Sequence, residues 1–279
     1  MAEQTVAGSA PAPTATASRA NEMQPDAPLL LVDNLTLRFG GVMALSHVSF
    51  DVLPGELFAV IGPNGAGKTS IFNCLSGVYR PQTGSILLEG HQLAEVKPTR
   101  AAELGVGRTF QNLGLFENLA LVDNLLLGRH HLMGTGFLGG ALWWGKARRE
   151  ELLHRVAVED IIDLLELSAY RTQPVGMLPY GIQKRIELGR ALAMEPKLLL
   201  LDEPAAGMSV EETEDMVRYI LEIRDALRLS IILVEHDMHV VMDIAERVMA
   251  LDFGEVLTIG KPSEVQADER VIEAYLGGS

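Results

Sequence analysis

A glycine-rich segment near residue 65 has the residue types and the spacing of a phosphate-binding loop. Glycines let the backbone wrap closely around phosphates with several N–H groups pointing inward, and a following helix adds the positive end of its dipole. The segment fits the pattern G-x-x-x-x-G-K-[ST] and consists of Gly62, Pro63, Asn64, Gly65, Ala66, Gly67, Lys68 and Thr69, followed by Ser70. The sequence predicts a nucleoside triphosphate site here, with Lys68 reaching the β- and γ-phosphates and Thr69 coordinating Mg²⁺.

Two adjacent carboxylates, Asp202 and Glu203, follow a run of four leucines at residues 198–201. Such a run is typical of a buried strand, and α/β sheets bind ligands at the C-terminal ends of their strands. We expect Asp202 to hold Mg²⁺, directly or through a water molecule, and Glu203 to polarise an attacking water. An acidic turn without a catalytic role is the alternative, and the phosphate-binding loop weighs against it.

Apolar runs elsewhere in the chain provide the elements that must position these motifs. Residues 57–61 directly precede the loop and predict a strand that is buried on both faces. Residues 198–201 and 231–234 predict two more buried strands, joined by a helix over about 210–227 that starts at a capping box, Ser209–Glu212. Because a strand–helix–strand unit implies a parallel sheet, we expect an α/β fold with a P-loop NTPase core and a mixed or parallel sheet.

The remaining segments differ in composition. Residues 1–28 are rich in Ala, Pro, Thr and Ser without apolar periodicity, which predicts a disordered tail. Short apolar runs between residues 29 and 52 predict an N-terminal antiparallel β subdomain, and patterns from about residue 98 to 192 are mainly helical. We expect one domain over 29–279, with a catalytic core at 29–100 and 193–279 and an inserted α-helical subdomain at about 101–192.

The overall composition excludes several classes of protein. The chain has 23 Lys and Arg against 37 Asp and Glu, a net charge of −14, and one cysteine, Cys74. Nucleic-acid binding requires a basic face, and one cysteine cannot form a disulfide framework. The sequence contains no apolar run of about 18 residues that could span a bilayer. We therefore expect a cytosolic protein with no affinity of its own for nucleic acid, and Cys74 to be a packed apolar residue.

An insert at residues 128–150 contrasts with the acidic remainder. Its glycine-rich apolar centre, which includes Trp143 and Trp144, is flanked on both sides by basic residues. With about 14 residues this centre is too short to span a membrane. Two interpretations stay open: a surface that docks a membrane protein or contacts lipid headgroups, and a helical hairpin buried inside the helical subdomain.

The motifs in combination resemble the nucleotide-binding domain of ABC transporters over residues 29–279. The resemblance rests on the loop at 62–69, on Asp202-Glu203-Pro204, on Gln111 within Arg-Thr-Phe-Gln-Asn and on His236 within Val-Glu-His-Asp. More narrowly, the chain is similar to the ATPase subunits of branched-chain amino acid uptake systems. This similarity lies in Arg-Phe-Gly-Gly at 38–41, Asp-Glu-Pro-Ala-Ala-Gly at 202–207 and Ala-Tyr-Leu-Gly at 274–277.

The resemblance implies roles for three further residues. Phe39 matches the aromatic residue that stacks on adenine, with a half-buried strand aromatic as the alternative. Gln111 matches the glutamine that reaches Mg²⁺ and signals to the membrane partner, and His236 matches the histidine that contacts the γ-phosphate. ATP and Mg²⁺ are the implied cofactors.

The chain departs from the family pattern at the signature loop. The family has Leu-Ser-Gly-Gly-Gln there, whereas residues 178–182 read Leu-Pro-Tyr-Gly-Ile. In the family this loop closes on the ATP held by the opposite subunit. Pro179 removes both a hydroxyl and an N–H donor, so the Gly181 N–H and the dipole of the following helix are the expected donors.

The resemblance implies an ATP-hydrolysing subunit of a bacterial importer of branched-chain or related amino acids. Such a subunit lies at the cytoplasmic face of the membrane as a peripheral protein. The expected partners are two membrane permease subunits, a second related ATPase subunit and, indirectly, a periplasmic substrate-binding protein, with no nucleic acid. An export ATPase of the lipopolysaccharide type stays an alternative. A regulatory subunit is suggested by Pro179 and Ile182 and opposed by Glu203 and His236. A P-loop GTPase should carry an Asn-Lys-x-Asp run that binds guanine, and this sequence has no such run.

Overall fold

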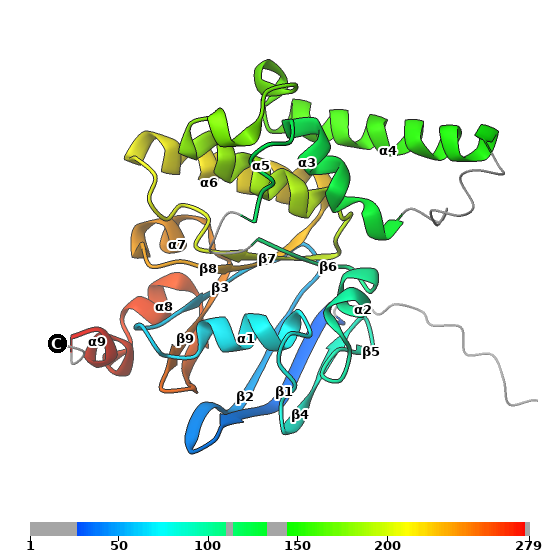
Figure 1. Ribbon diagram of the computed structural model, residues 1–279. Coiled ribbons are helices and arrows are strands. Elements are labelled where there is room, and N and C mark those ends of the chain that lie inside the picture. The colour runs from blue at the N-terminus through cyan, green and yellow to red at the C-terminus, as the bar shows by residue number, and fades with distance from the viewer. Residues whose placement is uncertain (1–26, 110–113, 133–143, 277–279) are drawn as a thin grey trace, which may run out of the picture.

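The computed structural model describes residues 27–109, 114–132 and 144–276, which form two sheets with helices on both sides of the larger one (Figure 1). The smaller sheet is antiparallel and has the strand order β2-β1-β4-β5. Its strands are β1 (Leu30–Phe39), β2 (Val42–Val52), β4 (Thr83–Leu88) and β5 (His91–Gln92). This confirms the N-terminal antiparallel sheet, in which residues 30–39 form one continuous strand, β1, whose pairing with β2 has register shifts that mark irregularities.

The larger sheet has the strand order β10-β9-β3-β8-β7-β6. Five of its strands are parallel, and β10 pairs with β9 in the antiparallel direction. In chain order they are β3 (Leu57–Ile61), β6 (Val106–Arg108), β7 (Leu198–Asp202), β8 (Ser230–Val234), β9 (Arg247–Asp252) and β10 (Glu255–Gly260). The three predicted buried strands are therefore confirmed as the neighbours β3, β8 and β7. Parallel pairing brings their C-terminal ends to one edge of the sheet.

Alternate residues of the buried strands face two different hydrophobic cores. Phe58 and Val60 of β3 pack on one side with α1 (Lys68–Leu75) and with side chains of the antiparallel sheet. Leu57, by contrast, packs on the opposite side with side chains of α5 (Tyr180–Leu192) and α6 (Val210–Leu227). Figure 1 shows α1 between the two sheets and the other two helices beyond the larger sheet. Both faces of β3 are thus covered, which explains its continuous apolar sequence.

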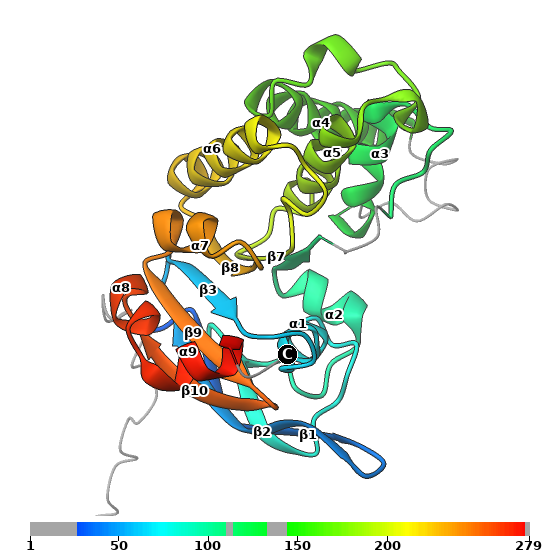
Figure 2. The ribbon, with the colours of Figure 1, turned by 90° about the vertical axis from the view of Figure 1, so that its left-hand side faces the viewer.

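The helices α3 (Leu121–Gly128), α4 (Trp144–Leu164) and α5 form a group at one end of the molecule (Figure 2). The other helices are α2 (Pro98–Glu103), α7 (Met238–Ile244), α8 (Pro262–Gln266) and α9 (Glu269–Leu276), and 3-10 turns occur at His130–Leu132, Ser168–Tyr170 and Val175–Met177. None of the helices in the described ranges combines the length and the apolarity needed to cross a membrane. Helix α6 has the predicted bounds, and its capping box is confirmed by reciprocal hydrogen bonds between Ser209 and Glu212.

The strand β6 and part of the insert at 128–150 differ from the sequence-based expectations, and other predicted segments lie outside the described residues. The mainly helical segment contains a strand, β6, which has three residues and a central glycine and so carries no recognisable alternation. In the insert at 128–150, Arg129 is buried and donates to His154, Ala193 and Glu195, so this part of the basic flank is internal. Residues 1–26 and 133–143, which include most of the expected tail and Trp143, lie outside the described residues.

Candidate nucleotide-binding site

The glycine-rich segment forms a loop between the end of β3 and the start of α1. Its glycines at 62, 65 and 67 have φ angles of +152°, +84° and +109°. A Cβ atom at Gly62 would lie 2.1 Å from the carbonyl oxygen of Leu251, and one at Gly67 would lie 2.7 Å from that of Ala44. Positive φ and close backbone packing together require glycine at these two positions.

Lys68 begins α1, and its side chain folds back over the loop. Its Nζ donates hydrogen bonds to the carbonyl oxygens of Gly62 at 2.6 Å and Pro63 at 3.0 Å. Burial lowers the pKa of the Lys68 ammonium, and the negative charges of Glu203 and Asp202 oppose that shift. The loop carbonyls therefore hold the Lys68 ammonium against the P-loop. There it also feels the negative charges of both predicted carboxylates.

A cavity of about 200 Å³ opens above this loop. Its lining combines loop residues with two side chains from the ends of β7 and β8, which are far apart in the sequence. The lining residues are Asn64, Gly65, Ala66, Gly67, Lys68, Thr69, Ser70, Glu203 and His236. Nine of the residues predicted from the motifs thus surround one polar cavity.

Glu203 and His236 contact each other at the edge of this cavity. The Glu203 Oε1 atom lies 2.5 Å from the His236 Nε2 atom. Glu203 has a left-handed backbone, with φ +51°, and its N–H donates to the carbonyl oxygen of Val234 at 2.9 Å. Because β7 and β8 are adjacent parallel strands, the residues that follow them meet at the same edge of the sheet.

Asp202, the last residue of β7, does not line the cavity and is almost completely buried, with 2% of its surface exposed. Its Oδ2 atom accepts a hydrogen bond from Arg108 Nη2 at 3.0 Å, and Oδ1 has no hydrogen-bond partner among the described residues. Burial raises the pKa of Asp202, and the hydrogen bond from Arg108 opposes this shift. One carboxylate oxygen is thus fixed by an arginine, while the other retains its capacity to accept a hydrogen bond or coordinate a cation.

Arg108 is a residue of this site that the motifs did not predict. Its guanidinium group also donates to Asn73 Oδ1 at 2.7 Å and Ser76 Oγ at 3.1 Å, so it connects the end of β6 to α1 and β7. The position of Arg108 three residues before Gln111 is the only signal in the sequence that could have suggested a role. Its partners become visible only when β6 pairs with β7.

Phe39, a predicted ligand-binding residue, does not line this cavity. Phe39 is 46% exposed at the end of β1, and its ring packs edge-to-face on Tyr79 with a centroid distance of 5.0 Å. Gln111 lies outside the described residues.

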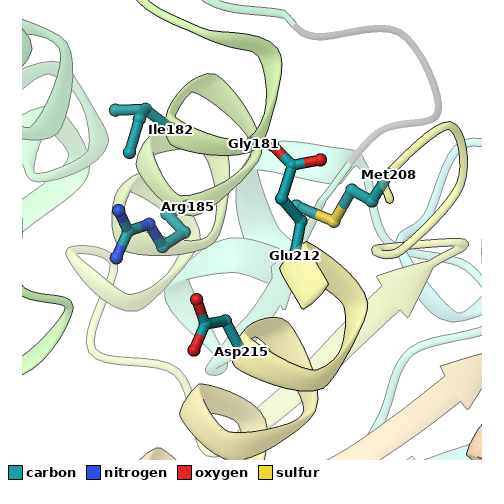
Figure 3. Close-up of a pocket in the computed structure, with 6 residues that line it drawn as sticks. All are labelled: Gly181, Ile182, Arg185, Met208, Glu212 and Asp215. Carbon is teal, nitrogen blue, oxygen red and sulfur yellow. The ribbon is translucent and has the colours of Figure 1, made fainter. Parts of the chain in front are cut away.

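Gly181 lies in the first turn of α5 and lines a different, smaller cavity of about 60 Å³ (Figure 3). Its lining residues are Gly181, Ile182, Arg185, Met208, Glu212 and Asp215. Figure 3 shows the Glu212 carboxylate beside Gly181, and a Cβ atom at Gly181 would lie 2.4 Å from Glu212 Oε1. The signature segment and the P-loop therefore belong to separate pockets of the chain.

The signature segment also contacts the loop that follows Glu203. The Tyr180 hydroxyl donates to the carbonyl oxygen of Ala206 at 3.1 Å. Pro179 is the N-cap of α5, where its missing N–H costs no intrahelical hydrogen bond. Pro179 and Tyr180, two of the three residues that depart from the family pattern, thus start the helix and link it to the neighbouring loop.

The glycine-rich loop lies between a buried strand and a helix, and it faces a carboxylate–imidazole pair. This loop geometry defines the class of P-loop nucleoside triphosphate-binding proteins. The comparisons with known proteins then specify the family. The ABC transporter family profile matches residues 45–206, and the profile of branched-chain amino acid ATP-binding cassette transporters matches residues 255–279. The chain belongs to the ABC transporter family and, within it, to the branched-chain amino acid ATP-binding cassette group.

Individual relatives agree with this assignment. The chain is 39% identical to the high-affinity branched-chain amino acid transport ATP-binding protein LivG of Escherichia coli, over 90% of this chain and 98% of LivG. It is 40% identical to the corresponding protein BraF of Pseudomonas aeruginosa, over 90% of this chain and 98% of BraF. The crystal structure of the ADP conformation of MJ1267, an ATP-binding cassette of an ABC transporter, is similar with a TM-score of 0.78 and 27% identity, covering 90% and 99% of the two chains. The P-loop fold expected from the sequence is thereby confirmed.

Proposed function

We propose that this chain is the ATP-hydrolysing subunit of a bacterial importer of branched-chain or related amino acids. The contact between Glu203 and His236 at the edge of the P-loop cavity is the observation that carries the catalytic part of the proposal. The names of LivG and BraF support the transported substrate class. Because a regulatory subunit would not need an assembled carboxylate–imidazole pair, the same contact argues for a hydrolysing one.

Mg²⁺ fits the residues of this pocket. Asp202 has a buried carboxylate oxygen without a partner among the described residues, and Thr69 lines the cavity. Carboxylate, hydroxyl and amide oxygens are the ligands that Mg²⁺ prefers. Thr69, Asp202 and Gln111 would hold the ion, which when bound would offset the negative charge of the β- and γ-phosphates.

The remaining steps are assigned to side chains and backbone groups of the chain. The N–H groups of residues 64–70 bind the phosphates, and the Lys68 ammonium exchanges its two loop carbonyls for phosphate oxygens. Glu203 accepts a hydrogen bond from the attacking water and orients it toward the γ-phosphate. His236 holds the Glu203 carboxylate and contacts the γ-phosphate, and Phe39 stacks on the adenine ring.

The chain works in an assembly at the cytoplasmic face of the membrane, as a peripheral subunit. Its proposed partners are two membrane permease subunits and a second, related ATPase subunit, with a periplasmic binding protein delivering the substrate. The N-terminus of α5, with Gly181, closes on the ATP of the second ATPase subunit. Support for this arrangement comes from the ABC transporter family itself and from the separation of Gly181 from the P-loop cavity.

Replacing the proposed catalytic base tests the enzymatic part. Glu203→Gln keeps the size of the side chain but removes its charge, so ATP hydrolysis should fall about 100-fold or more while ATP still binds. Glu246→Gln, an exposed glutamate paired with Arg224, is the matched control and should hydrolyse ATP at the normal rate. Unchanged hydrolysis in Glu203→Gln would show that another group activates the water.

Uptake of radiolabelled leucine tests the direction and the substrate class. Cells that lack the gene should lose high-affinity leucine uptake, and the normal chain should restore it while Glu203→Gln should not. Normal leucine uptake in the deletion strain would refute the substrate assignment and favour the export alternative.

A further inference from the structure

A buried carboxylate joins the two loops that carry Glu203 and His236. Glu235 is the residue after β8, and 4% of its surface is exposed. Its Oε1 atom accepts the N–H of Ala205 at 3.0 Å, and its Oε2 atom accepts the N–H of His236 at 3.1 Å. One side chain thus connects the loop after β7 to the loop after β8, with one oxygen for each.

The chemistry of Glu235 is matched to this bridging position. Two backbone donors at nearly equal distances require two acceptors on one side chain, which a carboxylate provides and an amide does not. Burial raises the pKa of Glu235, and the negative charge of Glu203 acts in the same direction. The two backbone hydrogen bonds and the charge of His236 oppose this shift. The carboxylate therefore lies in an unfavourable environment that the two N–H groups make tolerable.

The loop after β7 needs such support because its backbone is strained. Glu203 has φ +51°, a left-handed conformation that residues with a Cβ atom adopt at an energetic cost. The Ala206 N–H donates to the Glu203 carbonyl oxygen at 3.2 Å, which closes a tight turn over residues 203–206. Ala205, the residue inside this turn, is the one that Glu235 anchors.

We propose that Glu235 is a positioning residue that fixes the loops of Glu203 and His236 relative to each other and so holds the carboxylate–imidazole pair in its catalytic geometry. Glu235 has no contact with the P-loop cavity, so its effect is on the chemical step and not on nucleotide affinity. This inference rests on the proposed function, because it assumes that Glu203 and His236 act in hydrolysis.

Steady-state ATP hydrolysis and ATP binding by the purified full-length chain test the inference. Glu235→Gln keeps the size of the side chain but leaves one N–H facing an amide NH₂ group, and it should lower kcat roughly 10-fold with the Kd for ATP unchanged within twofold. Glu56→Gln is the matched control, since Glu56 is also buried and accepts a backbone N–H, from Leu53, away from the cavity. It should leave kcat unchanged.

A double variant separates positioning from a general structural effect. If Glu235 acts through His236, then Glu235→Gln should cause less than a twofold further loss when added to His236→Ala. A 10-fold loss in both backgrounds, or an unchanged kcat in the single variant, would overturn the inference. The Glu203→Gln variant, measured in parallel, distinguishes the two proposals, because normal hydrolysis there would refute the proposed function whatever Glu235→Gln does.

Discussion

Replacement of Arg108 by methionine should strongly destabilise the folded chain. Arg108 and Asp202 form an ion pair with 8% and 2% of their side chains exposed, and the Nη2–Oδ2 distance is 3.0 Å. Methionine fills most of the volume of the arginine stem but supplies neither charge nor donors. The variant therefore leaves the Asp202 carboxylate buried without its cation, and Asn73 and Ser76 without their hydrogen bonds from Arg108.

The size of the effect follows from the cost of an uncompensated buried charge. Removing one partner of a buried ion pair typically lowers the free energy of unfolding by about 3–5 kcal/mol. Arg108→Lys keeps the charge but cannot reach Asp202, Asn73 and Ser76 together, so it should lose less. Combining Arg108→Met with Asp202→Asn removes the charge that needs a partner, and the double variant should be about 2 kcal/mol more stable than the sum of the two single losses predicts.

Urea unfolding followed by circular dichroism, in the presence of EDTA, measures these free energies. EDTA keeps divalent cations from binding to Asp202 and replacing the lost arginine. The dependence of the unfolding free energy on urea should keep its slope, because the variants change stability and not the surface exposed on unfolding. Two strictly additive single losses would refute the reasoning, since the cost would then lie in lost packing and not in the unpaired charge.

Two further predictions concern the P-loop and the helix that follows it. Gly62→Ala places a Cβ atom 2.1 Å from the Leu251 carbonyl oxygen, so the loop must move. The affinity for ATP, measured by calorimetry, should therefore fall at least 10-fold. An affinity equal to that of the normal chain would contradict the described loop geometry. Burial raises the pKa of Cys74 to about 12. Iodoacetamide at about pH 8 should therefore leave this thiol unmodified in the folded chain and alkylate it in urea, as mass spectrometry would detect. Rapid alkylation of the folded chain would show that the helix α1 opens.

Sequence patterns predicted the parts of the fold whose residues carry their own signals. The buried strand β3 and the helix α6 have their predicted bounds, because a continuous apolar run and a capping box are local features. The P-loop and Glu203 could be assigned to one site because α/β sheets bind ligands at the C-terminal ends of their strands, and His236 was added by the family resemblance. The strand β6 was missed because three residues around Gly107 acquire their strand conformation from pairing with β7.

Residues whose roles depend on tertiary contacts gave no comparable signal. Arg108 and Glu235 each neighbour a recognisable motif residue, but the atoms they bind belong to segments far away in the sequence or across a turn. Tyr275 is a similar case, because its side chain has a hydrogen bond with the backbone of Gly62 in the P-loop. Spacing along the chain cannot reveal such contacts, since they exist only after the sheets have assembled.

The unusual signature segment is compatible with a hydrolysing subunit. The carbonyl of Pro179 accepts the first intrahelical hydrogen bond of α5, from the Gln183 N–H at 3.0 Å. Helix geometry then leaves the N–H groups of Tyr180, Gly181 and Ile182 without intrahelical acceptors, which is the arrangement that binds anions. Ile182 is 9% exposed and packs in the hydrophobic core under α5. Its side chain therefore does not replace the polar glutamine side chain that the family has at this position. Proline at the N-cap therefore removes a hydroxyl and an N–H donor, while the backbone donors that follow it, on which binding of a partner's phosphate would depend, are retained.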